Sequence, residues 1–251
     1  MNGKLLQNRV AIVTGGGSGI GQAICNAFAQ EGATVAVLDV AGEAAQAVAT
    51  SNDGLAITLD VSDASACADA VSKVASKLGC PTVLVCSAAY FAKRVPLADV
   101  ADDVWEKTLN VNISGHFNMS KQCIPHMIEA GGGSIVHISS IMAQVANFGQ
   151  TAYCTTKGAL TMLSKGIALD YAEDGIRSNT LMPGGIATKG MADLYGGDID
   201  RAEAEWGAVM HPLGRLGRVD EIADAAVFLA SNRSSFITGI DLPVEGGYSI
   251  R

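Results

Sequence analysis

Three side chains in this sequence could exchange a proton with one oxygen atom of a ligand. Tyr153 and Lys157 are four residues apart, so a helix would place both on one face, one turn above the other. A phenol with its ordinary pKa of about 10 is a poor base at neutral pH and needs a nearby cation, which Lys157 can supply. Ser140 follows an apolar run at residues 134–138 that indicates a buried strand. Ligands of open α/β sheets bind beyond such strand ends, so the three groups could meet there.

The order of the surrounding elements decides whether this pattern is more than a surface coincidence. Short β-rich runs alternate with segments that have helical spacing, and the interiors of the runs are almost continuously apolar, as in strands buried on both faces. This alternation predicts an α/β, Rossmann-type fold: a doubly wound seven-stranded parallel sheet in one domain over residues 1–251. The predicted strands are Arg9 to Thr14, Thr34 to Asp39, Leu55 to Asp60, Thr82 to Ser87, Ser134 to Ser139, Ile176 to Met182 and Asp241 to Val244.

A glycine-rich turn, Thr14 to Gly21, follows the first predicted strand and leads directly into a helix. Its glycines allow a pyrophosphate to approach the backbone at the helix N-terminus. Asp39, at the end of the second strand, can accept hydrogen bonds from the ribose of NAD and repel the 2′-phosphate of NADP. The turn contains no arginine or lysine, so we predict NAD as the cofactor. An ordinary turn, and a carboxylate that only caps a loop, remain the alternatives.

Composition excludes several other classes of protein. Of the 251 residues, 49% are hydrophobic and 17% are charged, which is enough to build a large core. No window approaches the roughly 18 consecutive apolar residues of a membrane span, and the N-terminus lacks the apolar run of a signal peptide, so we expect a cytoplasmic protein. The net charge of −8, without a basic run, argues against a nucleic-acid partner.

The cysteines and histidines do not form a recognisable metal-binding motif. The six cysteines contain no C-x-x-C pair and lie mostly in apolar segments, and the four histidines are scattered. We therefore predict reduced cysteines in the core and no metal site. Cys154, next to Tyr153, is a weaker candidate for a reactive thiol.

Together these motifs resemble the single-domain, NAD-dependent branch of the short-chain dehydrogenase/reductase family over essentially the whole chain. Asn112, in an N-V-N context, falls on the catalytic asparagine of that family. The further matching segments are Thr14 to Gly21, Asp60-Val61, Ser140, Tyr153 to Lys157, Pro183 to Thr188, Pro212 to Gly217, Phe228 to Ser231 and Glu245 to Gly247.

The resemblance implies an oxidoreductase that transfers a hydride between a secondary alcohol and NAD, giving the ketone. Tyr153 would be the base and Lys157 would lower its pKa and hold the nicotinamide ribose. Ser140 would stabilise charge on the substrate oxygen, and Asn112 would anchor a water in a proton relay. The implied cofactor-binding residues are Gly15, Ser18, Gly19, Ile20, Gly21, Asp39, Asp60, Val61, Ala88, Tyr153, Lys157, Ile186 and Thr188.

The expected substrate pocket is mostly apolar and lies beyond the strand ends. Its candidate residues are Tyr90, Ser140, Met142, Gln144, Val145, Tyr153, Gly185, Met191, Leu194, Tyr195 and Trp206. We predict a small to medium, fairly apolar secondary alcohol or ketone, with cyclic, aromatic and diol compounds as candidates. Residues 188–212 are predicted to form a mobile flap over it. The alternatives are a 3-oxoacyl-thioester reductase and a non-catalytic NAD-binding regulator.

The sequence departs from the family after the fourth predicted strand. Cys86-Ser87-Ala88-Ala89 replaces the usual Asn-Asn-Ala-Gly, whose asparagines brace the sheet and whose glycine leaves room beside the cofactor ribose. Val219 and Glu245 are milder departures. By resemblance we also expect a homotetramer, in which the predicted helices of residues 99–130 and 152–172 pair across a dimer interface.

Overall fold

A computed structural model describes residues 3–250 of the chain and contains a seven-stranded sheet. All neighbouring strands are parallel, in the order β3-β2-β1-β4-β5-β6-β7. The strands are β1 (Val10–Thr14), β2 (Thr34–Asp39), β3 (Leu55–Thr58), β4 (Val83–Cys86), β5 (Gly133–Ile138), β6 (Ile176–Pro183) and β7 (Asp241–Val244). The predicted doubly wound parallel fold is confirmed.

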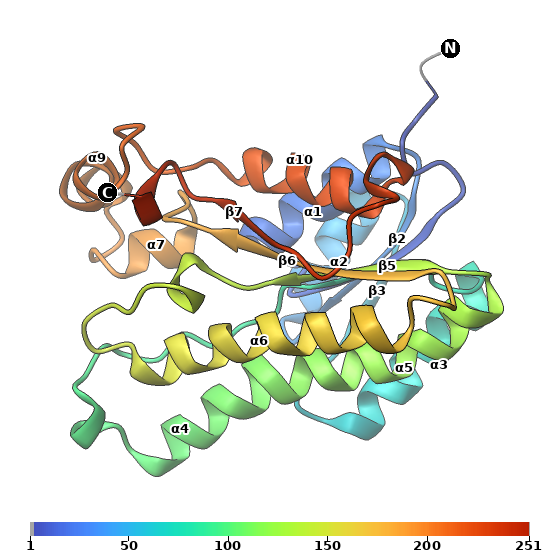
Figure 1. The fold of residues 1–251 in the computed structure, drawn as a ribbon, viewed down its shortest axis with the longest axis horizontal. Helices are drawn as coiled ribbons and strands as arrows, with labels where there is room; N and C mark the ends of the chain where they lie inside the picture. The colour runs from blue at the N-terminus through green and yellow to red at the C-terminus, as the bar shows by residue number, and fades with distance from the viewer. Residues whose placement is uncertain (1–2, 251) are drawn as a thin grey trace.

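Helices cover both faces of the sheet (Figure 1). One face carries α1 (Gly19–Gln30), α2 (Gly42–Ser51) and α10 (Val219–Ala230). The opposite face carries α3 (Ala64–Leu78), α4 (Asp102–Leu109), α5 (Gly115–Glu129) and α6 (Thr151–Asp170). Within residues 3–250, none of these helices combines the length and the apolar character that a membrane crossing requires.

The strands are apolar throughout because successive side chains enter two different cores. In β1, Val13 packs in the core under α1 and α10, whereas its neighbour Ile12 packs in the core under α3 and α5. In β2, Val35 and Ala36 divide in the same way. A central parallel strand of this sheet is therefore apolar at successive positions and does not alternate polar with apolar residues.

Two predicted boundaries differ from the structure for local reasons. β3 ends at Thr58 instead of Asp60, because the Asp60 carboxylate accepts hydrogen bonds from the Ser62 amide at 2.9 Å and the Ser62 hydroxyl at 2.7 Å and so starts a turn. The single helix expected over residues 99–130 consists of α4 and α5 joined by a π-helical turn, Asn110–Ser114. The other strand ends differ from the prediction by one residue or none.

Residues 188–212 fold into short helices at one end of the molecule, where the C-terminal segment also lies (Figure 1). They contain α7 (Lys189–Asp193), α8 (Ile199–Ala202), a π-helical turn (Glu203–Gly207) and α9 (Ala208–Met210). The segment is thus structured, and its mobility as a flap stays a prediction.

Candidate active site

The end of β5 and the first turns of α6 bring the three predicted catalytic side chains together. Ser140 caps a short 3₁₀ turn after β5, and its hydroxyl accepts a hydrogen bond from the Met142 amide at 3.1 Å. Burial raises the pKa of the Tyr153 phenol well above its usual value, and a side-chain hydrogen bond with Ser140 opposes this increase. The Ser140 hydroxyl and the Tyr153 phenol therefore lie together in one desolvated site.

Lys157 is buried next to this site, with an exposed fraction of 2%. Its Nζ donates a hydrogen bond to the Ile138 carbonyl at 2.7 Å and lies 5.4 Å from the centre of the Tyr153 ring. Burial lowers the pKa of Lys157 to about 7. The sequence predicts that Lys157 lowers the pKa of Tyr153, but the net shift in the structure is upward because desolvation outweighs the hydrogen bond with Ser140.

Asn112 connects the catalytic helix to the segment after β4. It lies in the π-helical turn and is fully buried. Its Oδ1 accepts a hydrogen bond from the Tyr90 amide at 2.7 Å, and its Nδ2 donates to the Tyr90 carbonyl at 3.1 Å and the Thr156 hydroxyl at 3.3 Å. Asn112 thus holds the main chain at Tyr90 against α6, a contact that spacing in the sequence did not indicate. The predicted water relay through Asn112 stays a prediction.

The glycine turn has the close packing that a dinucleotide phosphate site requires. Gly15 and Gly19 have φ values of 64° and 54°, in the left-handed region that favours glycine. A Cβ at Gly21 would collide with the Gly15 carbonyl oxygen. The turn ends at the N-terminus of α1, whose free amides favour an anion. The predicted residues Ser18 and Ile20 lie in this same turn and at the start of that helix.

Asp39 contacts both the glycine turn and its own loop. Its Oδ2 accepts a hydrogen bond from the Gly17 amide at 2.9 Å, and its Oδ1 accepts from the Ala41 amide at 2.9 Å. The carboxylate therefore lies at the glycine turn, where the sequence predicts the adenosine ribose. Geometry and charge at this position fit a nicotinamide dinucleotide.

The remaining predicted cofactor residues come from the segments that follow β3, β4 and β6. Asp60 and Val61 follow β3, and the Ala88 amide donates a hydrogen bond to the Thr14 hydroxyl at 3.2 Å. Thr188 caps α7 and lies beside the turn, since a Cβ at Gly19 would be 3.7 Å from Thr188 Cγ2. Ile186, two residues earlier, is buried.

Several predicted substrate residues meet in an apolar cluster beside Tyr153. Ile141, Met142 and Tyr248 are buried there, with Val145, Cys154, Trp206 and Met210 packed around them. The Trp206 ring covers Gly185, where any Cβ would collide with it. Of the other predicted residues, Gln144 is exposed, Tyr90 is half-buried, and Met191, Leu194 and Tyr195 lie in α7 and the turn after it, outside this cluster.

Two aromatic residues at the site have no clear signal in the sequence. Tyr248, near the C-terminus, stacks on Trp206 with ring centres 5.6 Å apart. Phe91 packs against Tyr153 with ring centres 5.0 Å apart. Both come from segments distant in the chain, so only the fold places them here. The segment match at residues 245–247 was the one hint that the C-terminus approaches the site.

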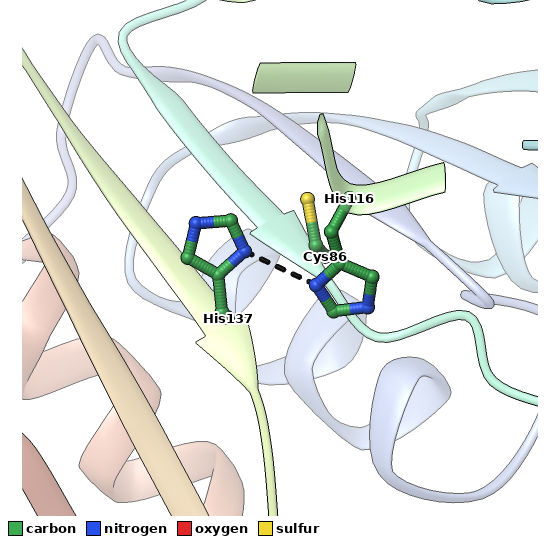
Figure 2. A group of neighbouring side chains, drawn as sticks. All are labelled: Cys86, His116 and His137. Atoms are coloured by element: carbon green, nitrogen blue, oxygen red, sulfur yellow. Dashed lines mark hydrogen bonds between the residues drawn. The ribbon is translucent and has the colours of Figure 1, made fainter. Parts of the chain in front are cut away.

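The structure places the cysteines in or near the core and brings two of the histidines together. All six cysteines are free, and Cys25, Cys67, Cys86 and Cys123 are buried. However, two of the histidines that are scattered in sequence, His116 and His137, lie beside Cys86, with their candidate ligand atoms within 4.8 Å of one another (Figure 2). A second group of this kind is Cys80, His126 and Glu129.

The fold is a parallel doubly wound sheet with a glycine turn before α1. Ser140 after β5 lies beside Tyr153 and Lys157 of α6. This combination is typical of one class of dehydrogenase. In agreement, the enoyl-(acyl carrier protein) reductase family model adh_short_C2 matches residues 15–249. The chain belongs to the short-chain dehydrogenase/reductase family.

Its relatives are dehydrogenases of alcohols and sugars. The chain is 35% identical over 250 residues to 2,5-dichloro-2,5-cyclohexadiene-1,4-diol dehydrogenase LinX of Sphingobium indicum, covering 98% of both chains. It is 38% identical over 251 residues to D-threitol dehydrogenase of Mycolicibacterium smegmatis, covering 98% of this chain and 95% of the relative. The ligand-free structure of Thermoplasma acidophilum aldohexose dehydrogenase superposes with a TM-score of 0.91 at 35% identity, over 99% and 96% of the two chains. The chain is thus an oxidoreductase that acts on CH–OH groups with a nicotinamide cofactor.

Proposed function

We propose that this enzyme oxidises secondary alcohols to ketones with NAD and catalyses the reverse reduction, with Ser140, Tyr153, Lys157 and Asn112 as its catalytic residues. The observation that carries the proposal is the shared buried site of Ser140, Tyr153 and Lys157. The bound nicotinamide would supply the hydride acceptor, so the chain has to supply orientation and proton transfer.

Each catalytic group would act at a definite atom. The Tyr153 phenol oxygen would take the proton of the substrate hydroxyl, and the Ser140 hydroxyl would donate a hydrogen bond to the same substrate oxygen. The positive charge of Lys157 would favour the ionised phenol. This requires the Lys157 ammonium to act from its place beside the Tyr153 ring, where it now bonds to the Ile138 carbonyl.

The choice of NAD over NADP rests on Asp39. Its carboxylate lies at the glycine turn, held by the Gly17 and Ala41 amides, and a negative charge there would repel a 2′-phosphate.

For the substrate, we propose a small to medium secondary alcohol of cyclic or diol type. The apolar cluster of Met142, Val145, Trp206 and Tyr248 supports an uncharged compound, and related enzymes are named for a cyclic diol and for a tetritol. Reduction of a 3-oxoacyl thioester is the second candidate, because the matching family model carries an acyl-carrier-protein reductase description.

The decisive experiment is Tyr153→Phe assayed with NAD on a panel of cyclic alcohols, diols and polyols. We expect turnover to fall by about 10²–10⁴-fold, the contribution of a general acid–base group, while the Kd for NAD changes little. Tyr171→Phe, at the other end of α6, is the control and should keep full activity. Substantial residual turnover in Tyr153→Phe would refute the assignment. If the wild type accepts only acyl thioesters, the second candidate replaces the first.

Three further proposals concern assembly, location and motion, and only the first of them rests on the family resemblance. We infer a homotetramer and a cytoplasmic location, and we infer that residues 188–212 move when substrate binds. The packing of Trp206 on Gly185 makes this segment one wall of the site, which is why its motion would control access.

A further inference from the structure

Two histidines lie next to each other in the core, beside Cys86 (Figure 2). His116 comes from α5 and His137 from β5, and both are almost completely buried. The rings are stacked with centres 5.3 Å apart and an interplanar angle of 20°, and their Nδ1 atoms are 3.1 Å apart. His116 Nε2 lies 3.4 Å from the Ala88 carbonyl oxygen. The pair therefore links β5 to the segment in which this chain departs from the Asn-Asn-Ala-Gly pattern.

The Ala88 carbonyl determines which nitrogen of each ring carries a proton. A carbonyl only accepts, so His116 Nε2 must be the donor to Ala88, and Nδ1 of a neutral His116 is then bare. His137 Nδ1 must consequently carry the proton that is shared across the 3.1 Å contact. This leaves His137 Nε2 as a bare lone pair, and among residues 3–250 that atom indeed has no hydrogen-bond partner. The opposite arrangement would direct a lone pair at the carbonyl and bury an unpaired N–H.

The surroundings keep both rings neutral. Burial lowers the pKa of His116 well below its usual value, with smaller effects of His137 and Lys157. Burial and then the charge of Lys157 lower the pKa of His137 to about 3. The Cys86 thiol also stays protonated, because burial raises its pKa. A proton added to His116 would place two Nδ1–H donors face to face, and a proton added to His137 would leave a buried N–H at Nε2 without a partner. The arrangement therefore has one stable form in the functional pH range.

We propose that the neutral His116–His137 pair is a positioning device that holds the Ala88 carbonyl, and with it residues 87–90, in the place of the asparagines that the family has here. The proposal rests on the function proposed above only in placing the cofactor at the glycine turn. It makes His116 and His137 positioning residues, since the rings act through their hydrogen bonds to each other and to the Ala88 carbonyl.

The position of Ala88 matters because its main chain packs tightly against the glycine turn. A Cβ at Gly15 would lie 2.8 Å from both Ala88 N and Ala88 Cα, so a small shift of Ala88 would close or distort the turn. Thr14 holds Ser87 and Ala88 from the side of β1 through hydrogen bonds of 3.1 and 3.2 Å. Asn112 holds Tyr90. His116 supplies the attachment on the remaining side, to α5 and, through His137, to β5.

The tautomers can be measured directly in the wild type by NMR of protein labelled with ¹⁵N at the histidine rings. Four sets of signals are expected, and single substitutions assign them. His116 should be protonated at Nε2 and His137 at Nδ1, and neither should titrate between pH 5 and 9. The opposite tautomers, or titration of either ring in that range, would overturn the proposal whether or not the enzyme has the proposed activity.

Variants test the positioning role. His116→Val removes the hydrogen bonds of His116 to His137 and to the Ala88 carbonyl. We expect calorimetry to show a Kd for NAD about 10-fold higher, as for the loss of one to two hydrogen bonds. The kcat at saturating NAD should stay within about twofold of the wild type. In His137→Asn, an amide can still donate to His116 Nδ1, so the Kd should stay within about threefold. His126→Asn, on the same helix but outside the pair, is the control. A His116→Val enzyme with lowered thermal stability and an unchanged Kd would show that the pair only fills space.

Cys86 provides a competing interpretation of the cluster as a metal centre. A metal bound by both Nδ1 atoms and the Cys86 thiolate would require both Nδ1 atoms to be bare, which contradicts the proposed proton on His137 Nδ1. Titration with Zn²⁺ and with Cu⁺ tests this. We expect no 1:1 complex that depends on Cys86. Stoichiometric binding that disappears in Cys86→Ser would overturn the positioning proposal.

Discussion

At the scale of single residues, Lys157 shows how burial changes an ionisable group in this enzyme. Its ammonium has the Ile138 carbonyl as a hydrogen-bond partner but is otherwise removed from water. The native pKa of about 7 lies below the ordinary value of 10.5. Burial therefore destabilises the charged form of Lys157, and the proposed mechanism needs this charged form.

This shift predicts a pH dependence of stability. Between pH 7 and about 9, the unfolded chain binds one more proton at Lys157 than the native protein, so the free energy of unfolding should rise with pH. Relative to Lys157→Met, the rise should approach about 1.4 kcal/mol per pH unit. Urea unfolding of the cofactor-free proteins at pH 7, 8 and 9 measures it. Lys73→Met, an exposed lysine on α3, should follow the wild type. Parallel pH profiles of Lys157→Met and wild type would contradict the buried, deprotonated lysine.

Asp39 leads to a prediction about cofactor choice. Asp39→Asn keeps the size of the side chain but removes the charge that would repel a 2′-phosphate. It also removes one of the two hydrogen bonds that the carboxylate accepts, because an amide has a single acceptor oxygen. We expect the ratio of kcat/KM for NAD to that for NADP to fall by about 10- to 100-fold. Glu43→Gln, an exposed carboxylate in the first turn of α2, is the control. An unchanged ratio would mean that Asp39 only supports the glycine turn through Gly17.

At the scale of elements, the end of β6 and the short helices after it form one wall of the site. Trp206 covers Gly185, and His211 accepts a hydrogen bond from the Gly185 amide at 3.0 Å. These contacts, both at Gly185, attach residues 203–211 to the segment that follows β6. The position of the wall is therefore sensitive to the size of that residue.

Gly185→Ala should displace this wall. The added methyl group would collide with the Trp206 ring and approach Leu216 Cδ2 to 2.9 Å, so the indole has to move out. We expect KM for the alcohol to rise about 10-fold or more, the Kd for NAD to stay within about twofold, and stability to fall by about 1–3 kcal/mol, the usual cost of overpacking. Gly190→Ala, where a Cβ has only ordinary contacts, should affect none of these. Equal KM values for the alcohol in Gly185→Ala and Gly190→Ala would show that Trp206 does not contribute to substrate binding.

At the scale of the whole molecule, α5 and α6 form an outer layer on one face of the sheet (Figure 1). Several large apolar side chains are exposed there, including Phe117, Met162 and Leu169, the last with an exposed fraction of 82%. Apolar groups gathered on one layer are typical of an interface between subunits. They agree with the pairing of these helices that the family resemblance implies.

The oligomer can be tested by light scattering coupled to size exclusion. We expect a particle of four times the chain mass of 25.7 kDa. Leu169→Glu would bury a charge in the interface and should shift the protein to a smaller assembly. Val40→Glu, an exposed apolar position next to β2, should leave the mass unchanged. A monomeric wild type would refute the tetramer.

Much of the fold and of the chemistry follows from local patterns in the sequence. Continuous apolar runs such as residues 134–138 indicate strands buried on both faces because each strand fills two cores. The glycines of residues 15–21 and the Tyr153–Lys157 spacing are short-range requirements of the backbone and of one helix face, so they can be read without any tertiary contact.

The tertiary structure alone decided what depends on contacts between distant segments. Tyr248 and Phe91 reach Tyr153 only because the chain folds back over the strand ends. His116 and His137 are 21 residues apart and become one hydrogen-bonded pair only when α5 packs on β5. The direction of the Tyr153 pKa shift also depends on desolvation by the folded protein, which no spacing in the sequence contains.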